Sequence, residues 1–533
     1  MRRLFVILLV LLLSPAAALT QPTPFCGVVD SIDFPIGDLV EGYDDFGQFR
    51  ARFGGNHVGL DIGFDRWGEP VYAAAKGRVT LSNIEEWDTE KGVVIVEHTF
   101  PDNSTAYTLY GHMEETDTIK FPQVGQCVDQ ETALGGIGWP SRGRPHLHYE
   151  IRNFMPNEGG PGYVTTNPLN EGWYHPLDFT ALWQIKLAPG FVDATTFYSV
   201  PALPPVMLED GLYAIASGNI LIVGDQRSGK ALWHVETDGV VTGIAGLPGN
   251  RVVAHTLNGQ VVTLQNGRYA ALWQVEGLDE PFLTLGETLV FAMAGGGLKA
   301  YDPAGNALWS LPPVSSAARV TQFAAGSREI ALGVRQDSGG VLWRLIDAAG
   351  EVQFETTFNQ QPVIVPARDG SWVGLDGAQF KRFANGENHT FGSVGAVPGR
   401  TAAATVDVLG RTYIYMGDAA STLVALGTDG DIRWRVRYPT AAASLPPLMD
   451  TGNGCLLYTL DMNGVLNIFD TTSGDLVNQV KIYAGGNRNS SPRARILDVD
   501  QNERVRAGSG FLSLVTLDGW ALGGTAASEC LLG

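Results

Sequence analysis

Hydrophobic and polar residues alternate in short runs over most of the chain beyond about residue 205, and turns containing glycine separate the runs. The tripeptide Ala-Leu-Trp follows such a run and turn at 231–233, 271–273 and 307–309, at spacings of 40 and 36 residues. Looser copies of the run and its turn surround four later positions: Trp343, Asn385, Trp434 and Ser473. This part of the chain therefore repeats itself about every 40 residues.

A strand, a tight turn and another strand at this period are typical of a β-propeller, in which four short strands build each blade. The repeats predict seven blades, with eight as the alternative. The recurring Trp is expected to pack between neighbouring blades. The last strand pair, near 511–520, is expected to complete a blade with the strands near 211–223. One or two β-sandwiches would explain the strands but not the fixed period.

The first third of the chain has a different character, since six of the nine histidines lie before residue 180. A proline-containing stretch at 199–206 resists helix formation and separates this part from the repeats. We expect a signal peptide at 1–20, a first domain at 21–185, a linker at 186–205 and the propeller at 206–533. With 66 glycines, many tight turns and an all-β chain are expected.

The N-terminus resembles an export signal, with Arg2 and Arg3 before ten apolar residues at 4–13 and small residues at 14–18. An uncleaved anchor is the alternative, but ten residues are too few to span a bilayer. The expected location is extracellular or periplasmic, with no membrane span after signal removal. The net charge of −20 argues against nucleic acid as a partner, because a phosphate backbone repels an acidic protein.

Four cysteines are compatible with disulfides in an oxidising compartment. Two are early, Cys26 and Cys127, and two are late, Cys455 and Cys530. Pairing within each domain is the expected choice among three possible pairings. No C-x-x-C motif points to a cysteine-based metal or redox site.

Two histidine motifs in the first domain suggest metal binding. His57 and Asp61 are four residues apart in an extended sequence, so both are expected on one face of a strand, which Gly59 leaves open. His146 and His148 are two residues apart and again share a face. Imidazole and carboxylate together suit zinc. A lone His-x-His pair is usually structural, but its combination with His57, Asp61 and a separate Tyr-Gly-His motif is not.

The set resembles the lysostaphin/LytM-type zinc metallopeptidases, whose pattern is His-x-Gly-x-Asp, Tyr-x-His and His-Leu-His-Phe-Glu. All three elements stand in order within residues 57–150. The resemblance implies a small antiparallel β-sheet or barrel-sandwich domain over about 50–155. Three departures concern substrate choice: the loop before the last motif reads Trp-Pro-Ser-Arg-Gly-Arg at 139–144, Tyr149 replaces Phe, and the Gly-, Pro- and Asn-rich segment at 153–175 does not align.

Carried over residue by residue, the resemblance implies that His57, Asp61 and His148 hold Zn²⁺, and that His112 and His146 are the catalytic histidines. Three protein ligands would leave a fourth position for water, whose pKa zinc lowers toward about 7. The implied activity is a zinc metalloendopeptidase acting on peptide bonds, typically in peptidoglycan cross-links or stem peptides. The alternative is a non-catalytic LytM-type binding or regulatory protein.

The repeats resemble the quinoprotein-like (PQQ-like) propeller, whose blades carry Ala-x-Asp-x-x-Thr-Gly-x-x-x-Trp. The segment at 466–476 is the closest copy. A propeller with quinoprotein dehydrogenase activity is disfavoured, because no vicinal Cys-Cys and no evident quinone pocket are present. The propeller is expected to dock the enzyme on a protein partner or a surface.

Overall fold

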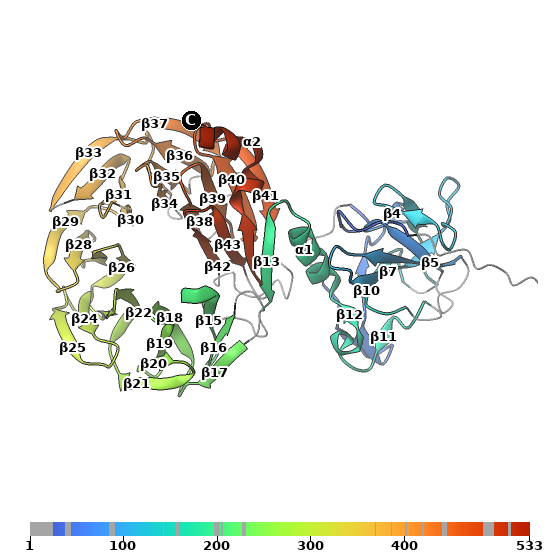
Figure 1. Cartoon of the computed structure of the whole chain (residues 1–533), viewed down its shortest axis with the longest axis horizontal. Coiled ribbons are helices and arrows are strands. Elements are labelled where there is room, and N and C mark those ends of the chain that lie inside the picture. The colour runs from blue at the N-terminus through green and yellow to red at the C-terminus, as the bar shows by residue number, and fades with distance from the viewer. Residues whose placement is uncertain are drawn as a thin grey trace, which may run out of the picture. The chain divides into compact units, whose positions relative to one another are not determined.

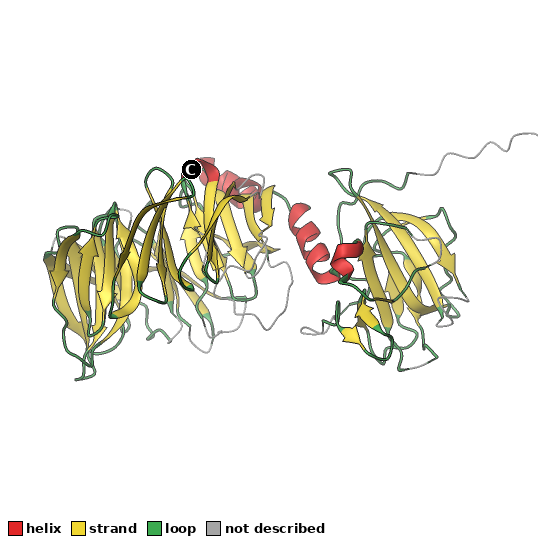
Figure 2. Cartoon of the chain, turned by 90° about the horizontal axis from the view of Figure 1, so that it is seen from below, coloured by secondary structure: helices red, strands yellow, loops and turns green. Residues whose placement is uncertain are grey.

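The structure is a computed structural model that describes residues 25–37, 44–84, 91–141, 143–155, 159–196, 203, 206–225, 231–367, 369–384, 386–399, 402–417, 420–439, 445–482, 495–509 and 513–532. The chain separates into two compact units, Met1–Pro176 and Leu177–Gly533 (Figure 1). Both are built almost entirely from strands, as expected (Figure 2). The predicted signal peptide lies outside the described residues. Within the described part of the chain, no helix is long and apolar enough to cross a membrane.

The first unit contains a nine-stranded and a three-stranded antiparallel sheet. The larger sheet runs in the order β12-β10-β7-β6-β5-β8, with β3 paired to β10 and β9 paired to both β4 and β7. Its strands are β3 (Leu60–Ile62), β4 (Pro70–Tyr72), β5 (Gly77–Asn83), β6 (Gly92–Thr99), β7 (Thr105–Glu114), β8 (Cys127–Val128), β9 (Ala133–Ile137), β10 (Leu147–Arg152) and β12 (Trp173–Tyr174). The smaller sheet contains β1 (Phe49–Arg50), β2 (Gly55–His57) and β11 (Tyr163–Val164), and a 3-10 helix spans Pro168–Glu171.

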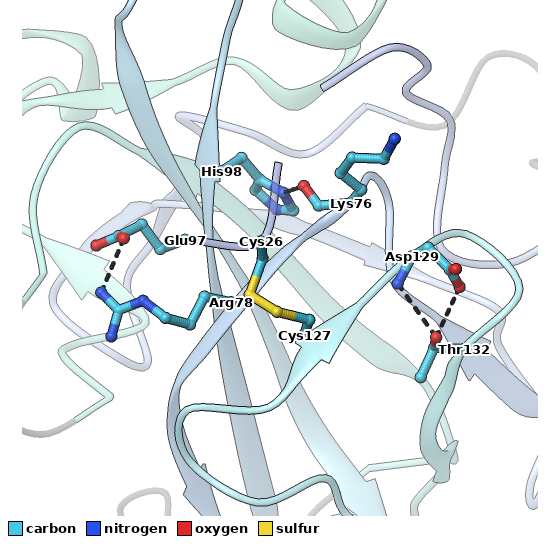
Figure 3. Close-up of a disulfide and its surroundings, with 8 residues drawn as sticks. All are labelled: Cys26, Lys76, Arg78, Glu97, His98, Cys127, Asp129 and Thr132. Carbon is cyan, nitrogen blue, oxygen red and sulfur yellow. Dashed lines mark hydrogen bonds and ion pairs between the residues drawn. A yellow bond between two sulfur atoms is a disulfide. The ribbon is translucent and has the colours of Figure 1, made fainter. Parts of the chain in front are cut away.

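The centre of the larger sheet is held by apolar packing and by one disulfide. Val93, Ile95 and Leu109 on β6 and β7 are fully buried and pack together. Cys26 is disulfide-bonded to Cys127 on β8, which confirms this predicted pair (Figure 3). The bridge ties the start of the described chain to the sheet across 101 residues of sequence.

The second unit contains eight four-stranded antiparallel sheets among the residues described, arranged in a ring (Figure 1). Seven of them use four consecutive strands each. In the first four of these the strands are β14 (Val206–Met207), β15 (Leu212–Ser217), β16 (Ile220–Asp225), β17 (Ala231–Glu236); β18 (Val241–Leu247), β19 (Arg251–Thr256), β20 (Gln260–Gln265), β21 (Arg268–Gln274); β22 (Leu278–Leu285), β23 (Thr288–Met293), β24 (Gly297–Tyr301), β25 (Ala307–Leu311); and β26 (Arg319–Ala325), β27 (Glu329–Arg335), β28 (Val341–Asp347), β29 (Val352–Phe358).

The remaining three consecutive sheets follow the same plan. Their strands are β30 (Val363–Pro366), β31 (Trp372–Asp376), β32 (Gln379–Ala384), β33 (Glu387–Ser393); β34 (Ala403–Val406), β35 (Thr412–Tyr415), β36 (Thr422–Leu426), β37 (Ile432–Arg437); and β38 (Leu448–Thr451), β39 (Leu456–Leu460), β40 (Val465–Asp470), β41 (Leu476–Lys481).

The eighth sheet joins the two ends of this unit. It pairs β13 (Phe191–Thr196) with β44 (Ser513–Asp518), followed by β43 (Arg504–Ser509) and β42 (Arg495–Val499). Eight blades, the alternative count, therefore replace seven. The prediction that the C-terminal strands pair with 211–223 is wrong, because that segment forms β15 and β16 of its own sheet. Part of the expected linker, 191–196, is β13 of this eighth sheet.

The repeated Trp packs against the glycine turn of the next sheet, as the repeat predicts. A Cβ added at Gly305 would lie 2.6 Å from the Trp273 ring, and one at Gly350 would lie 2.5 Å from the Trp309 ring. Both glycines also have positive φ, so backbone conformation as well as contact with the Trp ring disfavours a side chain at these positions. The Trp309 indole also donates to the carbonyl of Ala348 at 2.9 Å. The repeat thus encodes the contact between blades.

Two helices accompany the second unit. Helix α1 (Pro176–Lys186) places Ile185 in the same apolar cluster as Leu517 on β44, and Leu522 of α2 (Gly519–Leu532) joins this cluster. Cys455 is also disulfide-bonded. Its predicted partner, Cys530, has a side chain outside the described part of the structure.

Candidate metal centre

Three side chains converge on one buried point of the first unit. Nε2 of His57 lies 3.0 Å from Nδ1 of His148, and both nitrogens face Oδ1 of Asp61, at 3.2 and 3.1 Å. The three residues are at most 4% exposed. They come from β2, β3 and β10, so the sheets bring together candidate ligands separated by up to 91 residues.

The sheet register places His148 beside Asp61. On β10, His148 is directly opposite Asp61 of β3 on one side and Gly111 of β7 on the other. Directly opposite residues of an antiparallel pair point to the same face. The glycine at position 111 adds no side chain there, so the ring of His148 and the carboxylate share the space.

His57 reaches the same point from the smaller sheet. The expected single strand from His57 to Asp61 is wrong, because β2 ends at His57 and β3 begins at Leu60, in a different sheet. Gly59, in the connection, is required by crowding: a Cβ there would lie 2.6 Å from the Tyr149 carbonyl and 2.9 Å from Nε2 of His148. Tertiary packing of two sheets, rather than the alternation of side chains along one strand, therefore brings His57 and Asp61 together.

Each histidine is oriented by a carboxylate on its far side. Nδ1 of His57 lies 3.1 Å from Asp45, and Nε2 of His148 lies 2.9 Å from Oε1 of Glu150. The Trp173 indole donates to the other oxygen of Glu150 at 2.9 Å. In their neutral forms, both imidazoles keep the proton on the carboxylate side. Their second nitrogens then present lone pairs to one another and to Asp61.

Arg50 holds the outer oxygen of Asp61. Its guanidinium donates to Oδ2 of Asp61 at 2.9 Å, to Asp45 and to the Tyr163 hydroxyl at 3.1 Å. Burial opposes ionisation of Asp61, but when the two imidazoles carry a second proton, hydrogen bonds from His148 and His57 hold the pKa of its carboxyl well below the usual range. Burial likewise lowers the pKa of His57, but its bonds to Asp45 and Asp61 outweigh this and raise the pKa to about 9.

Two further histidines border the three converging atoms. The His146 ring lies 4.7 Å from that of His112, measured between centroids, and its Nε2 lies 3.6 Å from Oδ1 of Asp61. Nδ1 of His146 is 2.8 Å from the carbonyl of Arg144, which fixes the ring proton there in the neutral form. His146 stands one residue before β10 rather than within a strand.

A β-bulge aims His112. Between β6 and β7 the register changes so that Gly111 and His112 together oppose Val93 alone. His112 has a φ of +58°, in the left-handed region. Bulges commonly redirect a side chain next to a functional site. All five histidine and aspartate residues predicted from the sequence are therefore neighbours.

Comparison with known families agrees with this arrangement. Residues 55–162 match the family described as Peptidase family M23. Two overlapping stretches, 180–329 and 216–373, match the family described as outer membrane protein assembly factor BamB. Residues 55–162 thus form an M23 peptidase domain of the LytM type. A BamB-like repeat region follows it.

Solved structures similar to the chain are propeller proteins of low sequence identity. BamB from Moraxella catarrhalis is 17% identical and covers 62% of this chain and 98% of its own, with a TM-score of 0.43. Sqt1 from Chaetomium thermophilum is 12% identical over 62% of this chain and 99% of its own, with a TM-score of 0.49. The computationally designed Ika8 protein is 13% identical and covers 62% of this chain and 100% of its own, with a TM-score of 0.47. No curated protein matches the chain significantly.

The donor set of the M23 domain fits a zinc ion. M23 peptidases are zinc-dependent in general. Tetrahedral zinc with bonds of about 2.0–2.1 Å needs ligand atoms about 3.3 Å apart. The three atoms of His57, Asp61 and His148 stand 3.0 to 3.2 Å apart. Three acceptors facing one another repel unless a cation or a proton lies between them, so their convergence favours a metal.

Sequence reasoning missed the residues around these ligands. The last motif ends in Glu150, and His148, Glu150 and Arg152 are successive same-face positions of a strand that is otherwise apolar. That pattern was a usable signal. Asp45, Arg50 and Tyr163 carry no such signal, because they lie in short connections and in the smaller sheet.

Proposed function

We propose that the protein is exported and that its M23 domain is an active zinc metalloendopeptidase, which hydrolyses peptide bonds in peptidoglycan cross-links or stem peptides. The observation that carries the proposal is the convergence of His57, Asp61 and His148, with the two histidines 112 and 146 beside them. A non-catalytic binding protein has no need of all five. The BamB-like propeller would serve to dock the enzyme on a protein partner or surface.

In this proposal, His57, Asp61 and His148 hold the ion, which when bound would polarise the scissile carbonyl and acidify a water. Asp45 and Glu150 keep the two ligand imidazoles in the required tautomer by accepting their outer protons. Arg50 holds one oxygen of Asp61 and leaves the other toward the ion. The first-unit sheets thus orient every ligand before substrate arrives.

His146 is the candidate general base. Its Nδ1 proton is held by the Arg144 carbonyl, so Nε2 accepts a proton on the side of Asp61. His112, beside it, would donate a hydrogen bond to the carbonyl oxygen or a proton to the leaving amine. His146 would take up the proton that the attacking water loses and His112 would give one to the leaving amine, so the pair carries the same number of protons before and after hydrolysis.

The test is zinc content by mass spectrometry of the full mature chain, together with digestion of purified peptidoglycan. Wild type is expected to hold one zinc and to release new amine ends. His148→Ala is expected to lose both. The matched control is His234→Ala, an exposed histidine on β17, which should keep both.

Separate variants distinguish binding from catalysis. His146→Ala is expected to retain zinc while losing about 100-fold or more in cleavage. A wild-type chain without zinc would refute the metallopeptidase. A zinc-loaded wild type that cleaves no wall peptide would refute the catalytic proposal and leave a binding protein.

A further inference from the structure

Two exposed tryptophans form a pair on the surface of the M23 domain. Trp67 is 59% exposed and Trp139 is 51% exposed, and their rings meet edge to face with centroids 5.9 Å apart. Large aromatic side chains are normally buried when no ligand uses them. Two of them in contact, each more than half exposed, need an explanation beyond folding.

The backbone beneath the pair is fixed. The amide of Gly68 donates to Ile137 at 2.8 Å, and the amide of Trp139 donates to the Glu114 carboxylate at 2.7 Å. The Trp139 indole N–H is used by the Gly143 carbonyl at 3.1 Å. With the indole edge occupied, Trp139 presents chiefly a ring face to an incoming ligand.

The pair is tied to the candidate metal centre through the backbone beside Trp139, because the amide of Gly138 donates to the carbonyl of His112 at 2.8 Å. Phe64 lies against the His146 ring, with centroids 5.2 Å apart, and Arg144 covers Phe64 at 4.6 Å. Trp67 follows Phe64 by three residues, and Trp139 opens the loop that ends at His146. A substrate bound near His146 can therefore extend over the tryptophans.

The surrounding charges are already paired. Arg144 bonds to Asp65 at 2.8 Å, both 61% exposed in their side chains, and Arg66 bonds to Glu69. A strongly anionic or cationic ligand gains little from neutralised pairs. Their planar polar groups still offer hydrogen-bond donors and acceptors to hydroxyl or amide groups of a neutral ligand.

The small area and open shape of the tryptophan pair also limit the class of ligand that can bind there. The exposed indole surface is roughly 200–250 Å², far below the ~800 Å² per partner of a stable protein interface. An apolar peptide side chain prefers enclosure and would stay largely wet here. A pyranose ring stacks its C–H face on an indole and keeps its hydroxyls in water, which suits an open aromatic face.

We propose that Trp67 and Trp139 bind a neutral N-acetylated sugar of the glycan strand next to the peptide being cleaved. This inference rests on the proposed function for the choice of polymer. Trp139 opens the connection at 139–144 that departs from the LytM pattern. The pair would select cross-links by the sugar attached to them.

The probe is the β-1,4-linked trimer of N-acetylglucosamine, titrated into the full chain treated with a chelator, with tryptophan fluorescence and calorimetry as readouts. Removing the metal separates sugar binding from peptidase activity, so either proposal can fail alone. We expect a Kd on the order of 1 mM or tighter. Trp67→Ala and Trp139→Ala should each weaken binding about 10-fold or more, and Trp139→Phe should restore most of it.

The matched control is Leu272→Ala, a 57% exposed apolar residue of the second unit, which should bind as wild type does. Circular dichroism checks that each variant is folded. Absence of trimer binding by wild type would overturn the proposal. So would binding that survives both alanine variants, or a dependence on the tryptophans for a sugar-free wall peptide but not for the trimer.

Discussion

Nε2 of His148 lies 2.9 Å from Oε1 of Glu150, two residues further along β10, and both side chains are buried. The strand period of two places them on one face, with Arg152 next in line. Trp173 donates to the second oxygen of Glu150. The carboxylate therefore determines which nitrogen of His148 faces Asp61 and would be free to bind a metal.

Glu150→Gln is expected to weaken zinc binding about 10- to 100-fold while the domain stays folded. The amide keeps the shape, but it is a poorer acceptor for the His148 proton and leaves the buried Arg152 without its neighbouring charge, 3.4 Å away. Competition with a chelator measures the affinity. Glu97→Gln, which removes a partly exposed carboxylate beside Arg78, is the matched control and should bind zinc as wild type does.

Gly59→Ala is expected to reduce zinc affinity and to destabilise the domain by about 1–3 kcal/mol. Its Cβ would meet the Tyr149 carbonyl and the His148 ring at under 3.0 Å, so the ligand ring must move. The control is Gly37→Ala, where the added Cβ has nothing within 4 Å. Chemical unfolding and zinc titration of both variants provide the check, and equal behaviour of the two would contradict this explanation.

How far the sequence predicts this site depends on which contacts are local. The three motifs identified the five histidine and aspartate residues that meet, and the 40-residue period identified the propeller. The prediction of a single strand from His57 to Asp61 is wrong, because these residues lie on strands of two different sheets that pack together. The partner of β44 was also missed. Pairing between β13 and β44 spans more than 300 residues, and no local pattern encodes such a contact.

His112→Asn is expected to fold as wild type does, whereas His112→Val should lose about 1–2 kcal/mol of stability. The φ of +58° at this bulge is tolerated by His and Asn but crowds a β-branched side chain. Both variants should lose peptidase activity by about 100-fold or more, since neither carries an imidazole. Thermal unfolding and peptidoglycan digestion separate the two effects. An activity that survives in His112→Asn would remove His112 from catalysis.

The buried His98 is expected to lower the free energy of unfolding in acid, independently of the candidate metal centre. The side chain is fully buried on β6, with Nδ1 at 2.9 Å from the Lys76 carbonyl (Figure 3) and Nε2 at 2.8 Å from the Thr108 hydroxyl. Burial lowers its pKa from 6.5 to about 4, against the smaller opposing effect of the Lys76 bond. The folded state therefore keeps His98 neutral at pH values where an unfolded chain would protonate it.

Because the unfolded state binds the extra proton, stability is lost as the pH falls from 6.5 toward 4, by about 3 kcal/mol for this one group. His98→Gln, which cannot titrate, should lose less, so the advantage of wild type over the variant shrinks across this window. Hydrogen exchange of peptides from β6 and β7, compared between the two full chains at each pH, measures the difference. The exposed His234→Gln should leave the pH profile unchanged. A constant difference between wild type and His98→Gln from pH 7 to 4 would show that His98 titrates normally in the folded chain, and the acid sensitivity would then belong to other groups.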